Sequence, residues 1–248
     1  MNAIYILWLR QLKRYFRSKA RMIGSVGQPI LFLVALGFGF GPIFQKAGGG
    51  DYIQFLAPGV VAMGILFTAM FMGIEIIWDK QFGFLKETLV APVSRFSIML
   101  GRTLGGATVA LMQGVIVFLI AWAVGFHPSF ALFGVAFIFM ILIAMFFTGL
   151  GTAIASVVDD MQGFPLIMNF IVMPTFFLSG ALFPLTGLPG FIEIIARLNP
   201  LSYGIDGLRA ALTAQPAHFG LWMDFGVLGA IALIVLGVGA YLFSKIEI

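Results

Sequence analysis

The sequence predicts an all-α integral membrane protein with six transmembrane helices, an interfacial amphipathic helix before them and an outer re-entrant helical hairpin between the fifth and sixth. Two observations predict this fold class. Of the 248 residues, 61% are hydrophobic and only 10% are charged, which is far from the composition of a soluble domain. Six apolar runs also reach the roughly 20 residues that an α-helix needs to cross a bilayer. In one transmembrane domain over 1–248, these spans are 23–44, 58–78, 104–124, 132–157, 164–183 and 221–243.

Residues 1–21 are too charged to span a membrane, but they have the pattern of an amphipathic helix. At about 100° per residue, basic side chains fall on one arc and apolar or aromatic side chains on the other. The basic arc holds Arg10, Lys13, Arg14, Arg17 and Arg21, and the other holds Ile4, Trp8, Leu12, Tyr15 and Phe16. Such a helix lies in the headgroup plane. It either anchors the first span or also contacts a cytoplasmic partner.

Lys and Arg are distributed unequally over the connections between the runs. With the N-terminus inside the cell, 11 of them lie on the cytoplasmic side and 3 outside, which is the asymmetry of the positive-inside rule. We therefore expect a multi-pass protein of the plasma or inner cell membrane with cytoplasmic N- and C-termini. The basic residues then contact membrane lipids, and we expect no nucleic-acid partner.

Few polar groups lie inside the predicted spans. Glu75 is a carboxylate within a span, three residues before the inner edge at Trp78, so its head can reach water or a basic partner such as Lys80. Cation-coupled carriers usually show several intramembrane carboxylates or paired broken helices. Gly101 and Gly105 have the small-xxx-small spacing that lets helices pack closely, and we expect them to serve ordinary packing.

No enzyme motif occurs in the chain. It has no H-E-x-x-H, no G-x-S-x-G and no G-x-x-x-x-G-K-[ST] phosphate loop, its two histidines lie in different connections, and it has no cysteine. We expect no catalytic residue, bound cofactor or metal here, so any nucleotide hydrolysis must belong to another chain.

Two connections are more apolar than simple links. Residues 79–103 form an inner loop that permits a short helix, with Phe82, Leu85 and Leu89 on one side, Val90 as a candidate for the same side, and Pro92 at its end. An exposed apolar helix needs a partner or the membrane surface. Residues 184–220 lie outside, yet two apolar helices separated by Asn199-Pro200 can be drawn in them. These helices dip back into the outer leaflet or cap the bundle.

Both connections resemble those of the membrane permease subunit of type-2 ABC exporters, in the drug-resistance branch, and the resemblance covers nearly the whole chain. The inner loop has Phe82-Gly83 and Pro92-Val-Ser-Arg95 of the family pattern, although Lys86 stands where an acidic residue is frequent. The outer connection has Ser179-Gly-Ala-Leu-Phe-Pro184 and the Asn-Pro motif, whose members here are Asn199, Pro200, Tyr203, Asp206 and Arg209.

The resemblance implies a homodimer or paired permeases, each docking a cytoplasmic ABC ATPase, so that two ATPase copies carry ATP and Mg²⁺. It implies that the ATPase is coupled through a helix containing Phe82, Gly83, Leu85, Leu89 and Pro92. The candidates for the transport path, by analogy, are Glu75, Met173, Phe176 and Phe177.

The expected cargo is a hydrophobic or amphipathic compound, drug-like or lipid-like, that is moved outward. A lipid-linked glycan exporter of the same family is one alternative. An ion-coupled secondary carrier and an assembly protein without transport activity are the others.

Overall fold

A computed structural model describes residues 3–187 and 189–246, and this part of the chain contains eleven α-helices and no strand. Predictions that fall on residues 1–2, 188 and 247–248 lie outside the described residues. The helices are α1 (Ala3–Arg17), α2 (Lys19–Lys46), α3 (Tyr52–Phe71), α4 (Ile74–Gln81), α5 (Phe84–Val90), α6 (Arg95–Val124), α7 (Phe133–Val157), α8 (Gly163–Phe177), α9 (Gly190–Leu198), α10 (Pro200–Thr213) and α11 (Leu221–Ser244).

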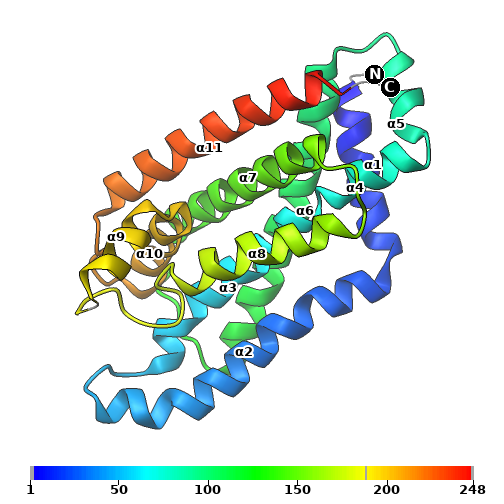
Figure 1. The fold of residues 1–248 in the computed structure, drawn as a ribbon. Helices are drawn as coiled ribbons and strands as arrows, with labels where there is room; N and C mark the ends of the chain where they lie inside the picture. The colour runs from blue at the N-terminus through cyan, green and yellow to red at the C-terminus, as the bar shows by residue number, and fades with distance from the viewer. Residues whose placement is uncertain (1–2, 188, 247–248) are drawn as a thin grey trace.

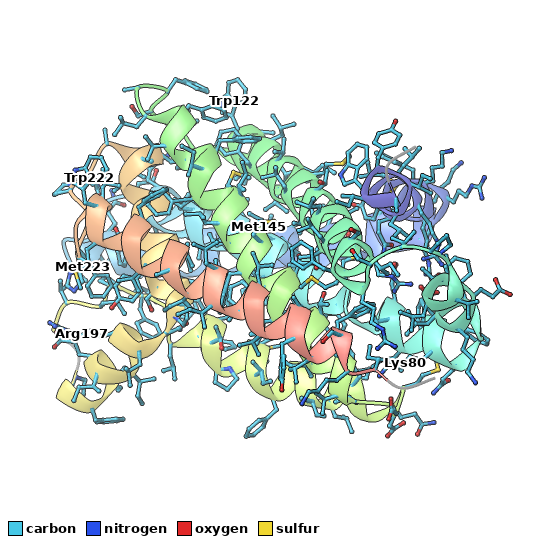
Figure 2. The ribbon with its side chains drawn as sticks, turned by 90° about the horizontal axis from the view of Figure 1, so that it is seen from above. Lys80, Trp122, Met145, Arg197, Trp222 and Met223 are labelled. Atoms are coloured by element: carbon cyan, nitrogen blue, oxygen red, sulfur yellow. The ribbon has the colours of Figure 1, made fainter. Side chains whose placement is uncertain are left out.

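The helices form a bundle with different elements at its two ends (Figure 1). Both termini, α1 and α5 lie at one end, α9 and α10 lie at the other, and α2 and α11 run along opposite sides. Figure 2 shows Lys80 at the first end, with Arg197 and Trp222 at the second. We call the end that carries α1, α4, α5 and the last turn of α11 the basic end.

Five of the described helices are long and apolar enough to cross a membrane. They span Met22–Lys46, Tyr52–Gln81, Arg95–Val124, Phe133–Val157 and Leu221–Ser244. The run predicted at 164–183 instead forms α8, a helix of only 15 residues that ends at Phe177. At about 1.5 Å per residue this helix is about 22 Å long, which is less than the roughly 30 Å hydrocarbon core. The predicted count of six spanning helices is therefore not confirmed.

Two spanning helices begin well before their apolar runs because polar residues cap them. The Asp51 side chain accepts a hydrogen bond from the backbone N–H of Ile53 at 2.9 Å, so α3 starts at Tyr52. The Ser94 side chain accepts from the N–H of Ser97 at 3.2 Å and starts α6. Both are preferred N-cap residues. The predicted inner loop, 79–103, therefore contains the first turns of α6.

The core lies around α3. Most of its side chains are buried, and it packs against α2, α6, α7, α8 and α10. In contrast, α2 and α11 bury only one side and expose large apolar residues such as Leu31 and Leu233. Exposed apolar side chains on long helices are expected where lipid is the solvent.

The predicted outer hairpin consists of α9 and α10, which are buried very differently. Most of α10 is buried against α3, α7 and α11. The apolar face of α9 is exposed, at Phe191, Ile194, Ile195 and Leu198. The two helices are present as predicted, while insertion of α9 into a leaflet remains a prediction.

Candidate functional site at the basic end

The predicted coupling segment is a sharp turn between α4 and α5. The turn is made by Gly83, whose φ of +78° lies in the left-handed region that favours glycine. Because the chain changes direction there, Phe82 and Leu85 do not share a face. Leu85 is 2% exposed, whereas Phe82 is 79% exposed. The single apolar face predicted for Phe82, Leu85 and Leu89 is therefore wrong.

The large apolar side chains that this turn exposes are Phe82 and Val90. Leu89 instead packs against the core. The helix ends at Val90 because Ala91, just before Pro92, has the extended conformation that a following proline favours. We call Phe82 and Val90 the docking turn.

Arg95, the first residue of α6, joins that helix to the end of the last helix. Its Nη1 donates hydrogen bonds to the carbonyl oxygen of Ser244 and, at 2.9 Å, to that of Ile246. These carbonyls lie at the C-terminal end of α11, where a cation interacts favourably with the helix dipole. The Pro-x-Ser-Arg pattern thus stops α5, starts α6 and holds α11.

Five charged side chains behind the turn form what we call the charge cluster. Its members are Arg10 and Arg14 of α1, Glu75 and Asp79 of α4, and Arg102 of α6. Arg10 donates to both carboxylate oxygens of Asp79, at 3.0 and 3.1 Å, and Arg102 bonds to the same carboxylate. Arg14 lies 3.6 Å from Glu75. Buried charges are stable when paired, so the cluster holds three helices in one arrangement.

The partner of Glu75 differs from the one predicted. Glu75 pairs with Arg14, whereas the Lys80 ammonium bonds to Asp159 at 2.9 Å and to the carbonyl of Ser156 at 3.1 Å. Five positions along a helix correspond to about 140° of rotation. Glu75 and Lys80 therefore point to different neighbours, and Lys80 joins α4 to the end of α7.

Close packing of α1 on α6 depends on Gly101 and Gly105. A Cβ at Gly101 would lie 2.9 Å from the carbonyl oxygen of Ile4, and one at Gly105 would lie 2.7 Å from Gln11 Cβ. The indole of Trp8 also donates to the Thr108 hydroxyl of α6 at 3.0 Å. The amphipathic N-terminal helix is present, but it ends at Arg17, and the predicted residues 19–21 belong to α2. It packs on the bundle through this small-xxx-small pair, while its place in the headgroup plane stays a prediction.

Beside the charge cluster lies a cavity of about 470 Å³, which we call the α2–α3 pocket. Its walls come from α1 to α4 and include the aromatic residues Tyr15, Phe67, Phe71 and Trp78 and the polar residues Ser25, Gln28 and Thr68. Behind it, the hydroxyls of Tyr15 and Ser25 both donate to the Gln113 side-chain oxygen, at 2.9 and 3.0 Å. A mainly apolar pocket of this size with a few polar groups suits a drug-sized ligand.

The predicted path residues that belong to α8 lie outside this pocket. Phe176 is fully buried and makes an edge contact with Phe32 of α2, with 6.1 Å between ring centroids. Met173 is half-buried and Phe177 is exposed. They belong to α8, whereas Glu75 lies in the charge cluster, so the structure does not bring the four residues together.

At the opposite end, the Asn-Pro motif holds the hairpin in place. The Asn199 side chain caps α10 by accepting from the N–H of Leu201 at 3.0 Å, and it donates to the carbonyl of Thr175 at 2.6 Å. Pro200 occupies the first turn of α10, where no N–H is needed. The Tyr203 hydroxyl donates to the carbonyl of Arg197 at 2.7 Å.

Arg209, the last member of the motif, reaches across the bundle. It donates to the carbonyl oxygens of Phe55 at 3.2 Å and Gly180 at 2.8 Å. Burial lowers the pKa of Arg209 to about 10, while the charges of Asp206 and Tyr52 act to raise it. Arg209 therefore stays charged at neutral pH, and it supplies hydrogen bonds to carbonyl oxygens of two other segments.

The comparison with known protein families covers both ends of this arrangement. The sequence model of the ABC-2 type transporter family matches residues 2–213, a range that contains the docking turn, the charge cluster and the Asn-Pro motif. This chain belongs to the ABC-2 type transporter family. The predicted resemblance is thereby confirmed, and with its long apolar helices this ABC-2 chain is a multi-pass membrane protein.

Relatives of this ABC-2 chain include transport permeases of similar length. A protein named transport permease ycf38 from Pyropia yezoensis is 30% identical over 99% of this chain and 89% of its own length. Nodulation protein J from Rhizobium leguminosarum bv. trifolii is 28% identical over 86% of this chain and 79% of its own length. The similarity therefore extends over most of each protein.

Two charged residues of this ABC-2 permease were missed in the sequence. Arg102 was assigned to the inner loop, yet it lies buried in α6. Asp224 is buried in the first turn of α11. The signal for Asp224 was available, because it is a carboxylate within the apolar run predicted at 221–243.

Proposed function

We propose that this chain is the transmembrane permease subunit of an ATP-driven exporter. Membership of the ABC-2 family supports transport. We propose that ATP hydrolysis belongs to a separate ATPase chain, and the lack of a phosphate-loop motif in this sequence is consistent with that. In this proposal two permeases pair, two ATPase copies dock at the basic end, and that end lies in the cytoplasm.

A single short helix, α4, connects the docking turn, the α2–α3 pocket and the charge cluster. The exposed Phe82 follows α4 directly, Ile74 and Trp78 of α4 line the α2–α3 pocket, and Asp79 of α4 is the centre of the charge cluster. These positions extend over about 12 Å of chain at 1.5 Å per residue. A displacement of the docking turn is therefore passed to the pocket wall through one rigid element.

The charge cluster extends such a displacement to other helices. Asp79 is bonded to Arg10 of α1 and Arg102 of α6, so these helices move with α4 or the buried pairs break. Packed helices change between discrete arrangements rather than deforming continuously. Closure of the ATPase pair would thus switch the bundle from one helix packing to another, and the pocket would have a different shape in each packing.

The pocket supports a hydrophobic or amphipathic cargo of drug-like or lipid-like type. Its aromatic walls suit an apolar body, whereas Ser25, Gln28 and Thr68 offer a few hydrogen bonds for a polar head. We propose that cargo enters here and leaves along a groove between the paired permeases, toward which Met173 and Phe177 of α8 would face.

Purification and reconstitution test this function. The tagged chain is purified in mild detergent from its native membrane, and proteins that co-elute are identified by mass spectrometry. We expect a stoichiometric ABC ATPase, and we expect the reconstituted complex to move a fluorescent amphipathic dye across vesicle membranes only with hydrolysable ATP. A reproducibly lone chain, or movement of the dye without ATP, would overturn the proposal in favour of a carrier or an assembly protein.

A further inference from the structure

Two buried aspartates meet where α10 packs on α11, at the end remote from the charge cluster. Asp206 is 7% exposed and Asp224 is 0% exposed. The charge of Asp206 acts on Asp224, and α10, which carries Asp206, packs on α11. Within the described residues, no donor group bonds to either oxygen of Asp224. Two carboxylates cannot bond to each other unless one of them carries a proton.

The surroundings of Asp206 favour its ionised form. Its two oxygens accept the backbone N–H groups of His218 at 2.9 Å and Phe219 at 2.8 Å. The guanidinium of Arg209 on the same helix also interacts with it electrostatically. Hydrogen bonds to a carboxylate and a nearby cation both favour its charged form.

Asp224 has the surroundings of the neutral partner. No donor among residues 3–187 and 189–246 bonds to it, and a second negative charge buried beside Asp206 would be unfavourable. Its place in the first turn of α11 provides only the modest attraction of a helix N-terminus. We propose that Asp224 holds a proton and donates it in a hydrogen bond to Asp206, so that a bound proton fastens α10 to α11.

Few other titratable groups face this pair. Tyr203 and Arg209 lie on α10, and His218 is an exposed residue in the loop before α11. Of the other helices packed on α10, α3 contributes Tyr52, and α9 contributes Glu193 and Arg197, which pair with each other. The packed helix α7 has no titratable side chain, and the arginines of α6 lie in its first two or three turns, at the basic end. Arg209, with a pKa of about 10, keeps its charge over the neutral range.

The proton determines how firmly the hairpin is held. Without it, two carboxylates face each other in a buried contact, and their repulsion loosens α10 from α11. The folded protein binds one more proton than the unfolded chain does, so stability falls as the pH rises through the release of that proton. This latch is independent of the proposed transport function.

Unfolding of the purified full-length protein in detergent tests the latch. The apparent Tm is measured at one scan rate between about pH 5 and pH 9. We expect the wild-type Tm to fall by on the order of 4 °C. Asp224→Asn should show no such fall, because its amide N–H donates to Asp206 at every pH. Two controls, Glu193→Gln on exposed α9 and His218→Gln, should keep the wild-type slope.

Infrared spectroscopy gives a second measurement that needs no change in stability. The wild-type protein should show the C=O band of a buried carboxylic acid, which disappears at high pH and in Asp224→Asn. A wild-type slope in Asp224→Asn, a slope removed by His218→Gln, or no carboxylic-acid band in the wild type would each overturn the proposal. If Asp224→Asn does not fold, Asp206→Asn replaces it as the test. Its amide can donate to an ionised Asp224, so the carboxylic-acid band of the wild type should be absent from Asp206→Asn, and a band that remains there would contradict the proposal.

Discussion

Arg10 and Asp79 lie 69 positions apart in the sequence, yet two hydrogen bonds join them, from Nη1 at 3.0 Å and from Nη2 at 3.1 Å. A bidentate pair of this kind fixes direction as well as distance. It ties the first helix to α4 directly behind the docking turn. The guanidinium of Arg10 also lies 3.9 Å above the ring centre of Phe84, the first residue of α5.

Asp79→Asn should destabilise the bundle. The substitution keeps the shape of the side chain but leaves Arg102, whose side chain is 2% exposed, without its carboxylate. Breaking a buried pair in this way typically costs about 3–5 kcal/mol. The expected result is a clearly lower apparent Tm in detergent.

Asp159→Asn is the matched control for this change. Asp159 also pairs with a basic residue, Lys80, but its side chain is 84% exposed, so we expect a loss of no more than about 1 kcal/mol. Combining Asp79→Asn with Arg102→Met should recover part of the loss, because no unpaired charge is then left in the core. Equal Tm values for the two aspartate variants would contradict the role of the cluster.

Gly101→Ala should displace α1 from α6. The new Cβ would lie 2.9 Å from the carbonyl oxygen of Ile4, and backbone atoms cannot turn aside as the end of a side chain can. Overpacking of this kind costs about 1–3 kcal/mol. The fluorescence of Trp8 should report the shift together with the Tm, although other tryptophans contribute.

Gly27→Ala controls for the loss of a helical glycine. A Cβ at Gly27 meets no atom within 4 Å, so this variant should equal or slightly exceed the wild type in stability. If both alanine variants behave alike, close packing at Gly101 is not what positions α1.

The long helices of the bundle were largely predictable, whereas their starting points were not. Hydropathy and length identify a spanning helix because every backbone group in lipid must be bonded within it. Polar caps act on a single turn, so α3 and α6 began six and nine residues before the predicted runs, at Tyr52 and Arg95. Asp51 and Ser94 are cap residues that were visible in the sequence.

The arrangement of the candidate site could be predicted only in part. The coupling segment was located, but the left-handed turn at Gly83 placed Phe82 and Leu85 on different sides. Helical periodicity assumes a continuous helix, and so it failed at this glycine. The partners of Asp79 come from distant helices, and local patterns contain no information about which helices pack together.

Phe82→Ala should weaken binding of the ATPase while leaving the permease folded. Phe82 is exposed, so its loss should change stability by no more than about 0.5 kcal/mol. An aromatic anchor at an interface is often worth about 2 kcal/mol or more, which is roughly a 30-fold change in Kd. Titration of the ATPase against the purified permease measures this change.

Leu85→Ala is the opposite case, on α5 just beyond the Gly83 turn. Leu85 is buried, so truncating it should cost about 2–5 kcal/mol of stability. If Phe82→Ala bound the ATPase as the wild type does, and the same were true of Val90→Ala, the docking turn would have no part in the interface.

Gly24→Leu should obstruct the α2–α3 pocket without disturbing the fold. Gly24 lines the pocket, and a Cβ there meets no atom within 4 Å, so the added side chain enters open space that cargo would occupy. Competition for this space should cost about 1–3 kcal/mol of binding free energy, or roughly a 5- to 150-fold weaker Kd.

Fluorescence polarisation of an amphipathic dye on the purified permease measures the Kd directly, and vesicle transport measures the consequence. The control is Gly27→Leu, three residues further along α2, which gains the same side chain at a position that does not line the pocket. Both variants gain the same helix propensity, so a difference between them reports the pocket alone. Equal dye binding in the two variants would place the cargo elsewhere, and the groove bordered by α8 would then be the next surface to block.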